Sequence, residues 1–491
     1  MTNQTAGLDW RTRLRRWLRR ADPARLWLLG LLALPGYVVD SLEFLQVFSL
    51  FFLALFWVLL EPVVDAALAR DEETTAPTDW IGMGDRRELA VFYGMLPFTF
   101  VNPLMLVQDS FQFLGSAVAA VRHRGSLPAR GDERTVDYRL PVDGEWTVVN
   151  GSLDREFSHS WFPVNQRYAY DFVIADEDGR TRPEGSSPAV ENYYCHDEPV
   201  LAPADGVVVD VFETDLEPGR GGGVSHPLKR DIRGNYVTIQ HAPGEFSCLA
   251  HLVPGSVAVE PGESVDRGQE IGRCGHTGNS SEPHLHFQLQ DSPTFEMSAG
   301  LPVEFAGVET ESPWLDDSGS GTESTQESEA SAAIADGGES TAATGDKTAV
   351  TAGQRVRQDK RVDETGGEQF ETPKRRAVGT LERTALGFGV GILAAVFGGF
   401  LVDQPALSLA IGGCALAGLG SWALLNRVRT ARPGSLGVPV GLAVAAALWW
   451  VGSPVSAVVL VLAASLGYAA VAEIDRLRCR RGFGIADHRT S

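Results

Sequence analysis

The sequence has little lysine. Among its 491 residues, the lysines are Lys229, Lys347, Lys360 and Lys374. Acidic residues outnumber basic ones by 63 to 42, which gives a net charge of -21. We expect no nucleic-acid partner for so acidic a chain. An acidic, lysine-poor surface is typical of proteins that stay hydrated in high salt, and it predicts a halophilic host; the base composition of a GC-rich genome is the alternative.

Cysteine is also scarce. The five cysteines are odd in number, scattered, and without the CxxC spacing of a structural zinc site, so they predict no disulfide framework. Three of them, Cys195, Cys248 and Cys274, fall in the middle of the chain. We expect buried thiols there rather than a bridge.

Long apolar runs lie towards both ends of the chain. Residues 1–125 are expected to form an N-terminal membrane region, because the apolar run 26–60 follows a basic leader and is interrupted at Pro35 and Gly36 like a hairpin. No small-x-small cleavage site follows that run, which argues against a cleaved signal peptide. The run 89–121 contains prolines and polar residues, so a third span, a re-entrant pair and an interfacial helix all fit it.

The middle of the chain divides into a domain and a linker. Residues 136–305 contain short strand-like runs between Gly, Pro and Asp turns. Residues 306–373 are rich in small, polar and acidic residues, which predicts a disordered acidic linker. The expected fold class is therefore a mainly β soluble domain between α-helical transmembrane regions. The expected strands are residues 168–174, 206–212, 236–241, 248–251 and 284–290.

Residues 374–491 are expected to form a C-terminal transmembrane region of four helices, rich in glycine and alanine. Arginines flank these helices and, by the positive-inside rule, place the flanking loops and both termini in the cytoplasm. Arg122, Arg124 and Arg130 favour the cytoplasmic side for the middle domain of this multi-pass protein, whereas an odd number of membrane crossings before Arg122 would place that domain outside. The four apolar segments are residues 385–402, 406–425, 437–451 and 456–471.

The most informative stretch is residues 268–288, which read GQEIGRCGHTGNSSEPHLHFQ. In an extended strand, His284 and His286 point to one face while Leu285 and Phe287 point to the other. Two imidazoles on one face suit a metal ligand with a catalytic neighbour. For an isolated HxH pair, two surface histidines on an edge strand are the alternative.

This stretch resembles the closing motif of the M23 (LytM/lysostaphin-like) zinc metallopeptidase family, GQxIGxxGxTGxS followed by PHLHF. The upstream runs PVLAPADGVV at 199–208, GNYVTIQH at 234–241 and LAHL at 249–252 follow in the family's order. The resemblance covers residues 153–305. It implies a membrane-anchored, zinc-dependent metalloendopeptidase that hydrolyses bonds in a peptide or protein substrate.

The resemblance also implies roles for single residues. It makes His286 and Asp171 zinc ligands, and it gives His284 and His251 catalytic roles as general acid or base and in stabilising the oxyanion. Each residue has an ordinary alternative. Asp171 alone could be a carboxylate that makes turn hydrogen bonds at a strand end, and His251 could be a buried histidine bonded to a backbone carbonyl.

The chain departs from the family at the first ligand. Arg167 occupies that position, four residues before Asp171, and arginine does not lose its proton to bind zinc. His159 is the nearest substitute as a metal ligand, with His196 second. The departure also supports an alternative function, a catalytically inactive LytM-like module that binds a partner at the membrane.

Overall fold

The chain forms two compact units, Met1–Pro77 with Asp154–Glu156, and Thr78–Leu153 with Phe157–Ser491. The computed structural model describes residues 14, 23–37, 40–57, 90–91, 93–95, 102–312, 347–358, 369–375 and 454–485.

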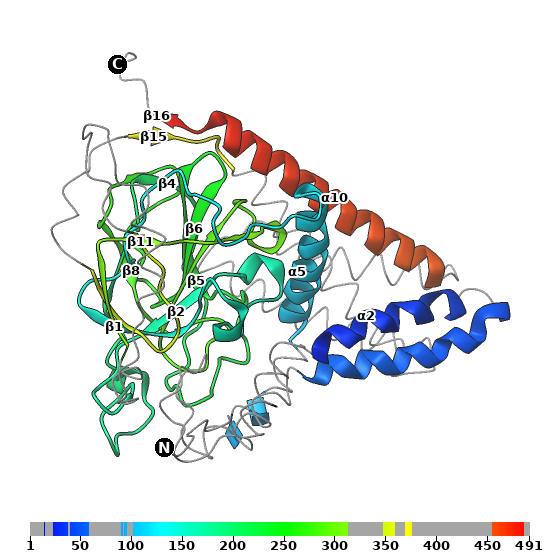
Figure 1. The fold of residues 1–491 in the computed structure, drawn as a ribbon, viewed down its shortest axis with the longest axis horizontal. Coiled ribbons are helices and arrows are strands. Elements are labelled where there is room, and N and C mark those ends of the chain that lie inside the picture. Colours follow the sequence, from blue (N-terminus) through cyan, green and yellow to red (C-terminus); the bar gives the residue numbers. More distant parts are fainter. Residues whose placement is uncertain are drawn as a thin grey trace, which may run out of the picture. The chain divides into compact units, whose positions relative to one another are not determined.

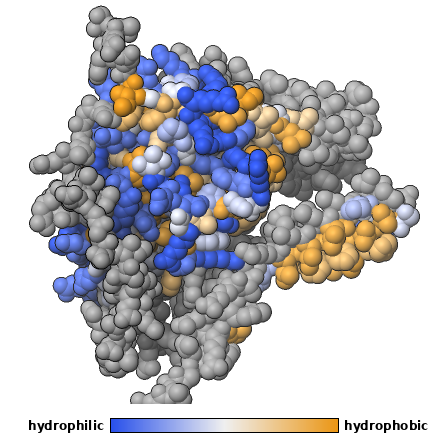
Figure 2. All heavy atoms as spheres, turned by 45° about the horizontal axis from the view of Figure 1, so that its top comes forward, coloured by the Kyte–Doolittle hydropathy of each residue, from blue (hydrophilic) through white to orange (hydrophobic). Residues whose placement is uncertain are grey.

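The first unit contains two helical arms. One arm runs through η1 (Pro23–Leu26), α2 (Trp27–Gly30) and η2 (Leu31–Tyr37), and the other is the 3₁₀ helix η3 (Asp40–Phe56). Exposed apolar side chains recur along η3 with the three-residue period of a 3₁₀ helix, and Figure 2 shows the hydrophobic surface of this pair. The arms agree with the expected hairpin, whereas their crossing of a membrane stays a prediction. The exposed side chains are Phe44, Val47, Leu50 and Leu53.

The second unit is organised around a 10-stranded antiparallel sheet (Figure 1). Its strand order is β12-β14-β1-β2-β9-β6-β5-β4-β7, and β10 pairs with β9. We call this sheet and the segments packed on it the β domain. The strands are β1 (Glu145–Asn150), β2 (Tyr170–Val173), β4 (Gly206–Phe212), β5 (Asn235–Ala242), β6 (Glu245–Leu252), β7 (Ser264–Val265), β9 (Leu285–Gln290), β10 (Gly300–Leu301), β12 (Val308–Glu311) and β14 (Arg355–Gln358).

Three further strand pairs lie outside this sheet, among the residues that the structure describes. They are β3 (Pro199–Leu201) with β8 (Glu270–Arg273), β11 (Phe305–Ala306) with β13 (Lys347–Thr348), and β15 (Phe370–Glu371) with β16 (Gly484–Ile485).

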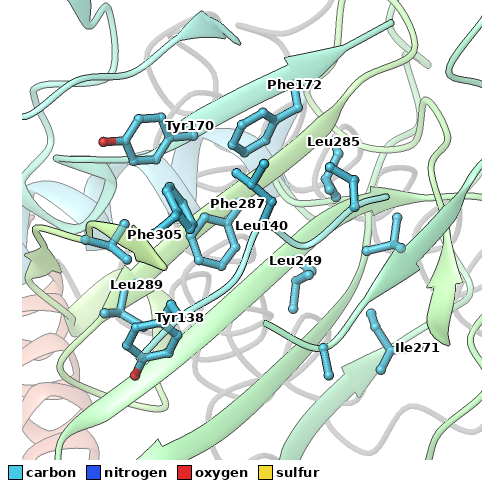
Figure 3. Close-up of a cluster of buried hydrophobic side chains, with 14 of the residues drawn as sticks. Tyr138, Leu140, Tyr170, Phe172, Leu249, Ile271, Leu285, Phe287, Leu289 and Phe305 are labelled. Carbon is cyan, nitrogen blue, oxygen red and sulfur yellow. The ribbon is translucent and has the colours of Figure 1, made fainter. Parts of the chain in front are cut away.

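The mainly β character of the middle domain is confirmed. All five expected strands occur, as β2, β4, β5, β6 and β9. Alternate side chains of these strands enter one hydrophobic core, as the period of two requires (Figure 3). Tyr170 and Phe172 of β2 face this core, together with Leu285 and Phe287 of β9. The residues between them are left for the opposite face of the sheet.

Helix α5 (Pro103–Arg122) packs on the β domain. Asn102 caps its first turn and also donates to the backbone oxygen of Lys229 at 2.9 Å. Further along, Gln108 accepts from the backbone of Ile232, and Ser116 accepts from that of Val164. By length and composition, α5 is a helix that could cross a membrane. In the run 89–121 the structure shows the helix α5, whose polar side chains bond the β domain, and the arrangement of this run relative to a membrane stays a prediction.

Helix α10 (Pro454–Gly482) contains the fourth apolar segment expected near the C-terminus and continues past it. Its side chains Tyr468, Ala469 and Ala472 pack with Phe111 of α5 and Met297 of η7 (Phe295–Met297). The other three expected segments lie outside the described residues, so a four-helix membrane region stays a prediction.

The domain boundary expected at residue 305 is too early. β12 and β14 pair with each other, and β14 also pairs with β1, so both extend the main sheet. Residues 347–358 were expected to belong to a disordered linker, and that prediction is wrong for them. A short strand on the edge of a sheet needs few large apolar residues, and Val356 supplies a buried one.

Gly278, in the histidine motif at residues 268–288, and Gly179 make a matched pair for testing how tightly that motif packs. Both have a φ of 77°, but a Cβ on Gly278 would lie 2.2 Å from the backbone nitrogen of Gly234, whereas a Cβ on Gly179 would meet nothing within 4 Å. We expect Gly278→Ala to lower the free energy of unfolding by about 3 kcal/mol or more. Gly179→Ala should cost about 1 kcal/mol, from backbone strain alone. Denaturant unfolding of both variants checks this, and equal losses would contradict it.

Candidate active site

Three adjacent strands bring the predicted site residues together. In the register of β2, β9 and β6, His286 lies opposite both Asp171 and Ala250. Paired residues point to the same face, so Asp171 and His286 project together, away from core residues such as Phe287. His284 lies two residues before His286 and shares its face by the same periodicity.

His251 reaches the cluster through a β-bulge. Ala250 and Leu252 of β6 pair with consecutive residues of β5, so His251 between them is the extra residue. Its φ of 65° is a left-handed value that residues other than glycine rarely adopt. The bulge takes the ring out of the normal alternation and places its centre 4.7 Å from that of His284.

The carboxylate of Asp171 lies at the centre of the cluster. His286 Nδ1 is 2.8 Å from Asp171 Oδ1, and His284 Nε2 is 3.8 Å from the same oxygen. His159 Nε2 is 3.8 Å from the other oxygen, Oδ2. Asn150 Nδ2 donates a hydrogen bond to Oδ2 at 3.1 Å. One carboxylate thus faces the imidazoles of three histidines.

Backbone carbonyls set the tautomers of His284 and His251. His284 Nδ1 lies 2.8 Å from the oxygen of Glu282, and His251 Nδ1 lies 2.8 Å from that of Thr277. A carbonyl oxygen only accepts, so each ring carries its proton on Nδ1 and leaves Nε2 bare. Burial lowers the pKa of His284 and holds that of His251 well below its usual range. Both rings are therefore neutral at pH 7.

Gln288 sets the tautomer of His286. Its amide nitrogen donates to the oxygen of Asn165 at 3.0 Å and to Gln290 Oε1 at 2.7 Å, which fixes the orientation of the amide. Gln288 Oε1 therefore faces His286 Nε2, at 3.1 Å, and accepts its proton. A neutral His286 ring with its proton on Nε2 has none on Nδ1. His286 Nδ1 and Asp171 Oδ1 then face each other with a lone pair each.

Such a contact requires a cation. Burial alone would raise the pKa of Asp171, but the hydrogen bond to His286 and the nearby histidines hold that pKa well below its usual value. Burial lowers the pKa of His286, but the contact with Asp171 outweighs this and raises it. Asp171 is therefore ionised, and a proton or a metal ion between the two side chains balances its charge.

The substitute ligands and Arg167 occupy different places. The guanidinium of Arg167 lies 5.1 Å from the ring centre of Trp161, and its Nε is 3.5 Å from the oxygen of that tryptophan. His159 lies beside Asp171, whereas His196 lies 3.4 Å from Glu217. Within the described part of the chain, no three histidine, cysteine, aspartate or glutamate side chains already converge as a complete ligand set.

Sequence reasoning missed two residues at this site. Asn150 bonds Asp171 through its amide nitrogen and accepts from the backbone of His159 at 3.1 Å through its oxygen. Nothing in the sequence marks it, because it lies on β1, far along the chain from the histidine motif. Gln288 could have been found, since it continues the two-residue spacing of His284 and His286.

Comparison with known proteins relates the middle of the chain to a family of peptidases. Residues 189–296 match the model of peptidase family M23. Peptidoglycan DD-endopeptidase ShyA of Vibrio cholerae is 31% identical over 186 residues, or 35% of this chain and 36% of ShyA. Peptidoglycan DD-endopeptidase ShyB of the same organism is 36% identical over 178 residues, or 36% of this chain and 37% of ShyB. This chain therefore spans little more than a third of these curated relatives.

A solved structure of a zinc-containing peptidase from Vibrio cholerae is 25% identical, covers 34% of this chain and 41% of its own, and has a TM-score of 0.21. The family match contains His251, His284 and His286 and begins after Asp171. The segment that carries these histidines therefore resembles peptidase family M23.

Proposed function

We propose that the chain is a zinc-dependent metalloendopeptidase that hydrolyses peptide bonds. The 2.8 Å contact between Asp171 Oδ1 and His286 Nδ1 carries this proposal. Two electron-pair donors in contact favour a shared cation, and carboxylate oxygen and imidazole nitrogen are both common ligands of zinc. The names of the relatives support a peptide as substrate.

His159 is the proposed third ligand. Its side chain is 39% exposed and is not packed in the hydrophobic core, so the ring can turn towards Asp171. Its backbone nitrogen is held by Asn150, which also holds Asp171. Asp171, His286 and His159 would then hold the metal and leave one position open. A zinc ion bound there lowers the pKa of water towards neutrality.

His251 and His284 are proposed to move the proton of the reaction. Both are neutral and present a bare Nε2 on the side of the cluster. A neutral imidazole can accept the proton of an attacking water as a general base. Once protonated, it can donate to the carbonyl oxygen or to the leaving amine. Their ring centres are 4.7 Å apart, which places both beside the same reacting group.

A non-catalytic binding module is the second candidate. The position of Arg167 favours it, because the side chain where the family has its first ligand packs on Trp161. A module of this kind would bind no zinc, or would bind zinc without cleaving peptides. Zinc content and cleavage together therefore separate the two candidates.

The first prediction from this proposed function concerns zinc content. The purified full chain should hold one zinc, and His286→Ala and His159→Ala should each lose it, because each removes one of three ligands. His196→Ala should keep it, since His196 pairs with Glu217. Metal analysis in high-salt detergent buffer measures this. If His159→Ala keeps zinc as His196→Ala does, His159 is not a ligand. If the unmodified chain holds no zinc, the enzyme proposal is wrong.

The second prediction concerns turnover. His251→Gln should keep zinc and cleave peptides about 10²- to 10⁴-fold more slowly, because the base is lost and the ligands are not. His226→Gln is the control, since His226 bonds its own loop at the backbone nitrogen of Leu228. Mass spectrometry of a peptide pool after incubation gives the rates. If the unmodified chain holds zinc but cleaves no peptide, the peptidase proposal is wrong and the non-catalytic binding module is favoured.

The third prediction concerns Asn150. Asn150→Leu keeps the size of the side chain but removes the bonds to Asp171 and to the backbone of His159. Loss of such support should weaken zinc binding by about 10- to 100-fold. Asn192→Leu is the control, because the side chain of Asn192 bonds Ser187, away from the histidine cluster. Competition with a chelator measures the affinity, and equal affinities in the two variants would refute the role.

A further inference from the structure

The segments on either side of the C-terminal apolar region are bound to each other. β15, which precedes this region, pairs with β16, which follows it, and Phe370 stacks on Phe483 with ring centres 5.3 Å apart. Arg375 forms an ion pair with Asp475, in which the two side chains are 4% and 1% exposed. The chain therefore leaves and re-enters the described structure at one place.

The same place belongs to the β domain. Arg375 also bonds Thr294 of the β domain, at 3.3 Å. Cys479 of α10 is buried against Val209 and Phe246 of the main sheet. The main-chain oxygen of Cys479 accepts a hydrogen bond from Gln240 at 3.1 Å. The last turns of α10 are thus part of the packed surface of the β domain (Figure 1).

The end of α5 joins this assembly. Arg122 bonds Asp291 of the β domain at 3.0 Å and Glu473 of α10 at 2.9 Å. His123 contacts the same aspartate at 2.8 Å. The basic end of α5, the β domain and α10 are therefore held by one group of ion pairs.

The first part of α10 has a different character. Residues 454–471 carry no charged side chain and, at about 1.5 Å per residue, extend for about 27 Å, which nearly equals the hydrocarbon thickness of a bilayer. Leu466 in this part is 62% exposed. An uncharged helix with an exposed leucine fits lipid. The packed part of α10 begins at Tyr468 and Ala469, which contact α5 and Met297, and the charged residues Glu473 and Asp475 follow.

We propose that α10 enters the lipid bilayer through residues 454–471 and that the chain crosses this bilayer an even number of times between Arg375 and Asp475. The contact between those two residues requires both to lie on one side. The four apolar segments of the sequence satisfy this parity. The β domain then lies against the membrane on the same side as the C-terminus.

The basic residues identify that side as the cytoplasm. With four crossings, the clusters 374–376, 427–432 and 476–481 all fall on the side of the β domain, as do Arg122 and Arg124. The positive-inside rule assigns such loops to the cytoplasm. Charge alone left the side of the β domain dependent on an unknown number of N-terminal crossings. The contacts of Arg375, Glu473 and Asp475 place the β domain on the same side as the C-terminal end of α10 without counting those crossings.

The cytoplasmic location limits which substrates the site can meet, and this inference rests on the proposed peptidase function. A site on the cytoplasmic face meets polypeptides of the cell interior and the cytoplasmic tails of membrane proteins. It does not meet the cross-linking peptides of a cell wall. We therefore infer a cytoplasmic polypeptide substrate at the membrane surface.

Cysteine labelling tests the topology. In a full-length Cys414→Ser background, Glu184→Cys reports the β domain, Ser491→Cys the C-terminus, and Gly452→Cys the position two residues before α10. Glu184 is 79% exposed, and the other described cysteines are buried. With a membrane-impermeant maleimide, Glu184→Cys and Ser491→Cys should label only in permeabilised cells, whereas Gly452→Cys should label in intact cells.

Each other labelling result overturns part of the proposal. Labelling of Glu184→Cys in intact cells places the β domain outside, and opposite results for Glu184→Cys and Ser491→Cys refute the even number of crossings. Protection of Gly452→Cys in intact cells refutes the crossing by α10. Labelling needs neither zinc nor cleavage, so these outcomes are independent of the proposed activity.

A double-mutant cycle tests the docking itself. Arg375→Ala and Asp475→Ala should each lower the thermal midpoint of the full chain in detergent by on the order of 10 °C, because each leaves a buried charge unpaired. The double variant should be no less stable than the worse single one. Additive losses would refute the pairing. Arg180→Ala, at an exposed ion pair with Asp178, is the control with little expected shift.

Discussion

The contact between Asp171 and His286 is the constraint on which the site depends. It follows from the register of two central strands, β2 and β9, and a slip by one residue would turn both side chains into the core. The core on the opposite face, built from residues such as Tyr170 and Phe287, resists that slip. Hydrophobic packing on one face of the sheet therefore fixes the positions of the charged groups on the other.

Much of this could be predicted from the sequence because it depends on a period of two. The pattern HLHF predicted which side chains of β9 share a face, and the turn residues predicted five strands of the sheet. Family resemblance then identified Asp171 and His251 as neighbours of these histidines. The proposed roles of the residues remain to be tested, but all five predicted side chains lie in one cluster.

The rest depended on tertiary structure. The bulge at His251 is a local break in the pairing of β5 with β6, and periodicity cannot predict such a break. Asn150 reaches the site because β1 pairs with β2, a pairing between strands that no local pattern specifies. For the same reason residues 355–358 could not be recognised as a strand, since their stability comes from the sheet edge that they join.

The polar residues that interrupt the apolar run of α5 indicate where this helix bonds the β domain. Its Gln112 accepts from the side chain of Asn165 at 3.1 Å, and the backbone oxygen of Asn165 accepts from Gln288, which in turn accepts from His286. A buried chain of this kind is costly when one member is missing, because the remaining groups lose their partners. The polar side chains that weaken α5 as a membrane span are those through which it supports the histidine cluster.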